Sequence, residues 1–261
     1  MSVKEKMTAI ADNIRDKTEK TEKLNLDNIA SGINEVYEAG VKSEYDRFWD
    51  SYQSYGNQRY YKNSFSGRCW NNATFKPKYD IIATTAVSMF QECYITDLIG
   101  CLEKQNVRLD FSGVDYGFEN TFYGVSFPTI PQIDARKAKN GFSGTFRSSY
   151  IVTIQKIILN EQGTQYFGSA FDTATKLQNI TFEGAIGQNI SFSACPLTVE
   201  SMKSIITHLK NYAESESEGK YTLTLKDECK TKLQEDMERV ELDGEVYTYF
   251  ELIAVKGWNL A

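Results

Sequence analysis

The sequence predicts an α+β fold in which a short solenoid of stacked repeats lies between an N-terminal helical hairpin and a C-terminal α/β cap. The first observation is a series of phenylalanines separated by 25, 32, 24 and 25 residues: Phe65, Phe90, Phe122, Phe146 and Phe171. The second is that amphipathic helix patterns precede and follow this series. Repeat arrays need such end elements, because their terminal units would otherwise expose an apolar edge.

Further apolar residues recur at fixed offsets from the phenylalanines. In the first four units they lie five and eight residues after the phenylalanine, and in the last unit six and nine residues after it. In chain order the pairs are Trp70 and Ala73, Ile95 and Leu98, Phe127 and Ile130, Ile151 and Ile154, Leu177 and Ile180. A period of roughly 20–29 residues is typical of leucine-rich repeats, in which each unit gives one short strand. We therefore predict a leucine-rich-repeat-like solenoid over residues 65–195, with the phenylalanines and these partners as its core. The longest interval predicts an insertion of about seven residues within 115–121.

Residues 1–40 predict a helical hairpin. Apolar residues follow helical spacing in two short segments, and both segments are too short to be stable alone. Their apolar faces must therefore pack on each other, on the repeats or on another chain. The candidates for attachment or oligomerisation are Ile10, Ile14, Ile29 and Ile33.

Residues 41–64 predict a helix with one aromatic face. Its residues follow at i, i+3, i+4 and i+7: Tyr45, Phe48, Trp49 and Tyr52. Such a face could stack on sugar rings or cover the apolar end of the repeats. We favour the second interpretation.

Residues 196–261 predict a C-terminal α/β cap. The expected elements are a helix capped by Thr198 that ends near Tyr212, a strand at 221–225, a helix from Asp227 through Met237, and a helix at 249–255.

Charge and composition exclude several classes of function. The net charge is -6, residues 65–195 carry 11 basic and 11 acidic groups, and residues 196–261 carry 8 and 13. No basic stripe suits nucleic acid, and no apolar run suits a membrane span. Five cysteines without a C-x-x-C pair and a single histidine predict no metal and no cofactor. Met1 to Lys6 lead into a charged stretch rather than a signal core, so we expect synthesis in the cytoplasm.

Candidates for catalysis are few. His208 lies in a predicted helix, where a solvent-edge role is favoured over a general base. Four aspartates in the repeats could pair as acid and base in a polysaccharide depolymerase, although turn roles are favoured: Asp97, Asp110, Asp115 and Asp134. The chain is therefore expected not to be an enzyme.

Several strings resemble known proteins. The segment AFDTATKLQNITFEG at 170–184 resembles the BspA-like leucine-rich repeat. Four other strings are similar to proteins encoded near tail genes in phages and prophages of Gram-positive gut bacteria: VKEKMTAIADNIRDKT, EYDRFWDSYQ, FKPKYDI and KGWNL.

This resemblance implies a phage tail protein, either a tail fibre or a receptor-binding protein, located in the virion tail. The implied partners are a bacterial surface glycan or protein, other tail proteins, and further copies of the chain, with a trimer as the family expectation. The alternatives are a purely structural virion or baseplate protein and an adhesin, with the bacterial cytoplasm or surface as its location. If the ligand is a sugar, the candidate contacts are Tyr116, Tyr123, Tyr150 and Tyr166.

Overall fold

The structure is a computed structural model that describes Asp12, residues 65–67 and residues 70–261. The chain divides into two compact units, Met1–Gly56 and Asn57–Ala261. In the first unit the structure describes Asp12 alone, which is helical and exposed. The predicted hairpin at 1–40 and the predicted aromatic helix at 41–64 lie outside the described residues, and the predicted domain boundaries stay predictions.

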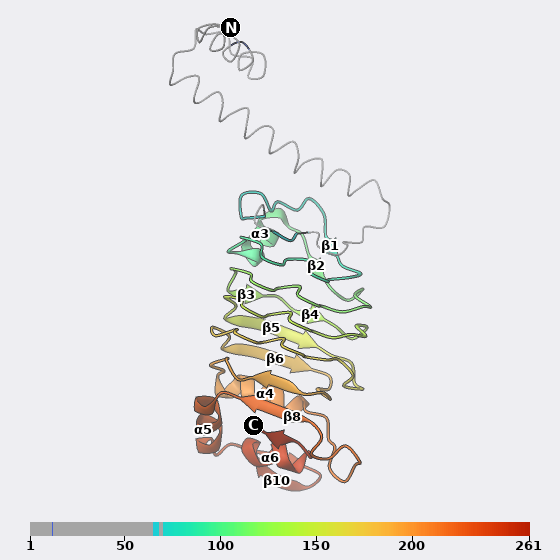
Figure 1. Cartoon of the computed structure of the whole chain (residues 1–261), viewed down its shortest axis with the longest axis vertical. Helices are drawn as coiled ribbons and strands as arrows, with labels where there is room; N and C mark the ends of the chain where they lie inside the picture. Colours follow the sequence, from blue (N-terminus) through green and yellow to red (C-terminus); the bar gives the residue numbers. More distant parts are fainter. Residues whose placement is uncertain (1–11, 13–64, 68–69) are drawn as a thin grey trace. The chain divides into compact units, whose positions relative to one another are not determined.

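The described residues form a mixed α/β fold with four helices and four small sheets (Figure 1). Three sheets are parallel and one is antiparallel. In chain order the elements are β1 (Ile81–Ile82), α3 (Leu98–Gln105), β2 (Leu109–Asp110), β3 (Thr129–Ile130), β4 (Ile133–Asp134), β5 (Thr153–Ile158), β6 (Asn179–Glu183), β7 (Ile190–Phe192), α4 (Val199–His208), β8 (Thr222–Leu225), α5 (Asp227–Glu235), β9 (Arg239–Leu242), β10 (Glu245–Thr248), α6 (Tyr249–Val255) and β11 (Asn259–Leu260).

The predicted fold class, a leucine-rich-repeat-like solenoid, is wrong. That fold requires one strand from every unit in a continuous sheet, whereas the strands here are divided among separate sheets and β1 to β4 have two residues each. The period in the sequence was real, but it reflects a different mode of stacking. Successive segments are joined by backbone hydrogen bonds between tight turns and by stacked rings.

The phenylalanine series forms the core, as predicted. Every member is at most 1% exposed. Each ring stacks on the next at centroid distances between 5.1 and 5.9 Å, and Phe192 continues the column beyond Phe171 at 4.4 Å. The predicted apolar partners are buried too, except Ala73, which is exposed. We call each segment that stacks on the next in this way a layer.

A second column of rings, absent from the sequence prediction, runs beside the first. Phe142 stacks on Phe118 at 5.1 Å and on Phe167 at 5.2 Å, with the ring planes within 9° of parallel. Three successive layers therefore share a pair of stacked aromatic positions.

Left-handed residues flank the phenylalanines of the first column at the same intervals. Two residues before the ring stand Ser88, Asn120, Gly144 and Ser169, and two residues after it stand Gly67, Glu92, Gly124, Ser148 and Thr173, all with φ between 52° and 91°. Each of the latter except Thr173 donates its backbone N–H to a carbonyl of the following layer at 2.8–3.1 Å. From Phe90 to Phe171, each ring of the first column therefore lies between two left-handed corners rather than in a strand.

The predicted insertion lies elsewhere than expected. Phe90 donates its N–H to Thr121, 31 residues on, whereas Lys139 and Asp115 are hydrogen bonded at a separation of 24. The extra residues must therefore lie between these two points in the same layer, where the eight-residue helix α3 stands. Asp97 caps this helix by accepting the Gly100 N–H at 2.9 Å. The prediction that the insertion lies within 115–121 was therefore wrong.

Helices cover both edges of the longest strands. In Figure 1, β3, β5 and β6 lie side by side in parallel register, and α3 contacts β3. At the other edge α4 contacts β6 and supplies two hydroxyls, since Ser201 Oγ accepts the Ile180 N–H at 2.9 Å and Ser204 Oγ accepts the Phe182 N–H at 3.0 Å. These serines pair backbone donors that would otherwise offer an edge for strand addition.

The C-terminal elements agree largely with the sequence. Thr198 caps α4 and Thr248 caps α6 with a capping box, as their sequences indicate. Helix α4 ends at His208 rather than Tyr212, α5 is preceded by Lys226 and ends before Met237, and the antiparallel hairpin β9–β10 was missed. No helix in the described part of the chain is long and apolar enough to cross a membrane.

Candidate functional site

The strongest candidate site is a group of tyrosines beside the second left-handed corner of the layers. Tyr94 and Tyr150 occupy equivalent positions, each four residues after a core phenylalanine and two after a left-handed residue. Their backbones are held alike, because Tyr94 N–H donates to Trp70 at 2.7 Å and Tyr150 N–H donates to Val125 at 3.0 Å. The two side chains therefore belong to one row and lie two layers apart, with one layer between them.

The layer between them carries small residues at the same corner. Ser126 is the residue equivalent to the two tyrosines, and Gly124 occupies the corner itself with φ +65°. Tyr123 precedes this corner and is half-buried. We call these five residues, Tyr94, Tyr123, Gly124, Ser126 and Tyr150, the tyrosine cradle.

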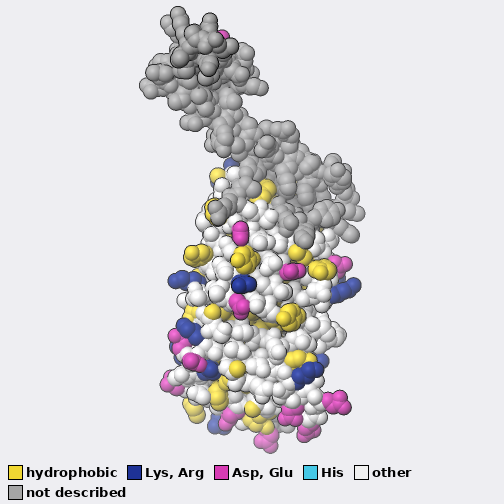
Figure 2. All heavy atoms as spheres, in the orientation of Figure 1, with side chains coloured by type: hydrophobic (Ala, Val, Ile, Leu, Met, Phe, Trp, Pro, Cys, Tyr) yellow, Lys and Arg dark blue, Asp and Glu magenta, His cyan; other side chains and the backbone are white. Residues whose placement is uncertain are grey.

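Exposure separates the cradle from the core. The phenylalanines of the first column are at most 1% exposed, whereas Tyr94 is 47% and Tyr150 is 64% exposed. Large aromatic side chains at interfaces combine an apolar ring with a hydroxyl that can donate and accept hydrogen bonds. In Figure 2 hydrophobic side chains stand singly on the described part of the face in view, with both signs of charge interspersed. Single aromatic contacts, rather than a broad apolar patch, are what such a surface offers.

Hydroxyls and one charge of each sign adjoin the cradle. Ser148 and Thr173 lie at the next two corners, with their hydroxyl oxygens 2.9 Å apart. Glu92 lies at the corner above, against Gly124, and Arg147 follows one residue after Phe146. The immediate surroundings are thus polar and balanced in charge.

The four tyrosines named from the sequence do not form one site. Tyr123 and Tyr150 belong to the cradle, whereas Tyr116 and Tyr166 lie at the other end of the ring-bearing segment. There Tyr116 accepts a backbone hydrogen bond from Asn140, and Tyr166 accepts one from Phe142. Tyr116 and Tyr166 are 52% and 54% exposed, and they serve below as matched controls.

Tyr94 was missed in the sequence, although a signal for it was present. Tyr94 and Tyr150 stand at the same offset from Phe90 and Phe146. The predicted attachment residues Ile10, Ile14, Ile29 and Ile33 lie outside the described residues.

Three of the four aspartates considered for catalysis, Asp97, Asp110 and Asp134, have local structural roles. Asp97 caps α3, Asp110 accepts the Ser112 N–H at 2.8 Å, and Asp134 binds the Arg136 guanidinium at 2.6 Å. Hydrogen bonding to Arg136 holds the pKa of Asp134 below its usual value, so this carboxyl is an ionised turn residue. His208 is half-buried and its Nδ1 lies 2.7 Å from the Ser204 carbonyl oxygen of its own helix.

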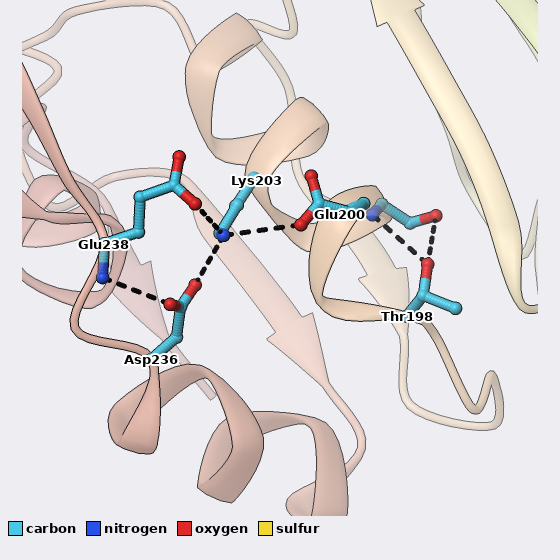
Figure 3. Close-up of polar contacts among 6 residues, drawn as sticks. Thr198, Glu200, Lys203, Asp236 and Glu238 are labelled. Carbon is cyan, nitrogen blue, oxygen red and sulfur yellow. Dashed lines mark hydrogen bonds and ion pairs between the residues drawn. The ribbon is translucent and has the colours of Figure 1, made fainter.

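A second candidate is the buried Lys203 with the carboxylates around it, since a buried amine could in principle act as a nucleophile. Its side chain is 9% exposed and its Nζ lies 2.8 Å from Asp236, 2.5 Å from Glu238 and 3.4 Å from Glu200 (Figure 3). The hydrogen bonds to Asp236 and Glu238 raise the pKa of Lys203 well above its usual value. The amine is therefore a protonated ammonium that ties α4 to the segment between α5 and β9, and it has no lone pair for catalysis.

Replacing Lys203 by methionine is expected to lower stability at pH 7 and to flatten its pH dependence on both sides. Asp236 has a pKa below its usual 3.8, so its contribution is present above that value and is lost as pH falls through the lower folded value. Lys203 has a pKa above 10.5, so its contribution is present below that value and is lost as pH rises through the higher one. Thermal unfolding of K203M and wild type between pH 2 and pH 11 measures the acid limb and the beginning of the alkaline limb.

The control for that series is K230M. Lys230 forms an ion pair with Asp227 of its own helix, where the Asp227 side chain is 97% exposed. Exposed pairs contribute little to stability. A K203M melting temperature no lower than that of K230M would contradict the structural role.

Three other buried residues are also unsuited to catalysis. Burial raises the pKa values of Cys93 and Cys195 to about 12, so both thiols are protonated at neutral pH. Burial lowers the pKa of Lys256 to about 8, but its Nζ donates to the carbonyl oxygens of Ile206, Thr207 and Leu209 at 2.6–3.0 Å. An ammonium with three donors fits that carbonyl set.

Within the residues that the structure describes, no group of three or more histidine, cysteine or acidic side chains could hold a metal ion. Compared with protein-family models, curated proteins and solved structures, the chain gives no match.

Proposed function

We propose that the chain is a phage tail protein, a tail fibre or receptor-binding protein, that recognises a bacterial surface component through the tyrosine cradle. The observation that carries the proposal is the exposure of Tyr94 and Tyr150 at equivalent positions of a rigid stack. Aromatic anchors with low conformational entropy are typical of binding surfaces. The resemblance of several strings to phage tail proteins supports this setting and implies a location in the virion tail.

The described side chains support binding rather than turnover. Asp97, Asp110 and Asp134 are engaged in a cap, a turn and an ion pair. Lys203 is held in ion pairs, and His208 and Lys256 contact backbone carbonyl oxygens. The resemblance further implies that copies of the chain assemble, with a trimer as the expectation, and that other tail proteins hold it. A repeated row of contacts on each copy would then give avidity on a cell surface.

Binding of the labelled full chain to intact cells tests the proposal. A panel of Gram-positive gut bacteria is incubated with the protein, and bound fluorescence is measured by flow cytometry. We expect saturable binding to at least one strain, without release of reducing ends from its surface polysaccharide. If no strain binds the chain, the receptor-binding function is rejected. If reducing ends appear, the non-catalytic assignment is rejected.

A further inference from the structure

We propose that the tyrosine cradle binds a neutral polysaccharide that runs along the layers, with one sugar ring on Tyr94, one on Tyr150, and the link between them over Ser126. This inference rests on the proposed function and adds the class and the direction of the ligand. Three features of the tyrosine cradle support it: the spacing of the two rings, the height of the layer between them, and the charge of the cradle.

The spacing of the two rings sets the repeat of the ligand. Hydrogen-bonded strands lie about 4.8 Å apart, and the core rings of these layers stack at 5.7 and 5.9 Å. Positions two layers apart are therefore separated by about 10–12 Å. An extended peptide presents side chains on one face about every 7 Å, which falls out of step with the two tyrosines. A chain of pyranose rings presents a flat C–H face on each ring, and its flexible links let two such faces meet Tyr94 and Tyr150.

The layer between the rings leaves room for the link. Ser126 has only a hydroxymethyl group where its neighbours in the row carry phenol rings, whereas the Glu92 side chain lies against Gly124. Tyr123 stands beside this step and is half-buried, so its exposed portion forms one wall. A polymer lying along the row therefore meets a ring, a low step and a second ring in order.

The polar groups of the cradle match uncharged hydroxyl-bearing ligands. Tyrosine and serine hydroxyls both donate and accept hydrogen bonds, as sugar hydroxyls do. Glu92 and Arg147 flank the cradle with one charge of each sign, and residues 65–195 carry 11 basic and 11 acidic groups. A strongly anionic polymer would find no excess of positive charge here, so the surface fits a neutral glycan.

The test uses a strain that the full chain binds. Cells are treated with protease to remove surface proteins or with periodate to cleave vicinal diols of sugars. We expect binding to survive protease and to be lost after periodate. Binding should also change little when the salt concentration rises from about 0.05 to 0.5 M, since salt screens charge attraction. Loss after protease would identify a protein or peptide ligand, and loss at high salt would identify an anionic polymer. Both outcomes overturn the inference.

Variants locate the contact. We expect Y94A and Y150A each to weaken binding roughly tenfold, which corresponds to about 1.4 kcal/mol. Ser126→Phe should weaken it at least as much by filling the step, whereas Ser126→Gly should not. The matched controls Y116A and Y166A remove equally exposed rings at the other end and should bind as wild type. Unchanged melting temperatures and near-UV circular dichroism establish that each variant is folded.

The failures are distinguishable. If wild type binds cells but Y94A and Y150A bind equally well, the cradle assignment is overturned while the receptor-binding function stands. If wild type binds no strain, the proposed function fails and this inference falls with it.

Discussion

Replacing Phe122 by alanine is expected to lower the free energy of unfolding by about 3–5 kcal/mol, the usual range for a buried phenylalanine. Its ring is fully buried and stacks between Phe90 at 5.7 Å and Phe146 at 5.9 Å. The edges of Phe111 and Phe127 meet it at 6.0 and 6.1 Å. Neighbours fixed on four sides cannot collapse into the space, so the cavity should remain.

Urea denaturation of F122A, F122L and wild type measures this effect. F122L keeps most of the apolar volume and should lose less than F122A. Tyr150→Ala removes a ring of similar size from the exposed row and should change stability by no more than about 0.5 kcal/mol. A loss below about 1 kcal/mol in F122A would show that the first ring column does not hold the layers together.

Gly141→Ala is expected to destabilise the protein by about 3 kcal/mol or more. Gly141 has φ +75°, a conformation that costs an L-residue about 1–2 kcal/mol. A Cβ added there would also overlap the backbone nitrogen and oxygen of Tyr166 in the next layer. Overpacking of this kind adds about 1–3 kcal/mol, because backbone cannot move aside as a side chain can.

Gly244→Ala is the matched control. Gly244 has φ +83° in the turn between β9 and β10, but nothing lies within 4 Å of an added Cβ. It should therefore show the conformational cost alone, about 1–2 kcal/mol. Equal losses in the two variants would mean that residues 141 and 166 are not in contact between layers.

The core was predictable from the sequence because it repeats. The Phe65 series and its partners stand at regular intervals, and burial leaves few other residue types for those positions. The fold class was not predictable in the same way. A period near 25 residues is expected of any fold that stacks units of that length. The left-handed corners at Glu92 and Thr173 are not marked by a distinctive residue type.

The second ring column and the insertion show what one sequence leaves open. Phe118, Phe142 and Phe167 also follow the 24 and 25 residue intervals, but with 15 phenylalanines in the chain their significance appears only when the rings are seen stacked. The insertion was assigned to residues 115–121, while Asp97 and the apolar pair Leu98 and Leu102 already indicated a capped helix.

The candidate site was partly predictable. Two residues of the tyrosine cradle, Tyr123 and Tyr150, were named from the sequence as candidate contacts. The grouping was wrong because Tyr116 and Tyr166 are equally exposed but lie at the other end of the segment. Only the register between layers shows that Tyr94 and Tyr150 share a row.

The measurement that tests the central claim most directly is hydroxyl-radical footprinting of the full chain, free and bound to polysaccharide isolated from a strain that it binds. Tyrosine oxidation is read residue by residue by mass spectrometry. The account predicts protection of Tyr94, Tyr123 and Tyr150, with Tyr116 and Tyr166 oxidised as in the free protein. Protection of Tyr116 and Tyr166 with none at Tyr94 and Tyr150 would contradict it.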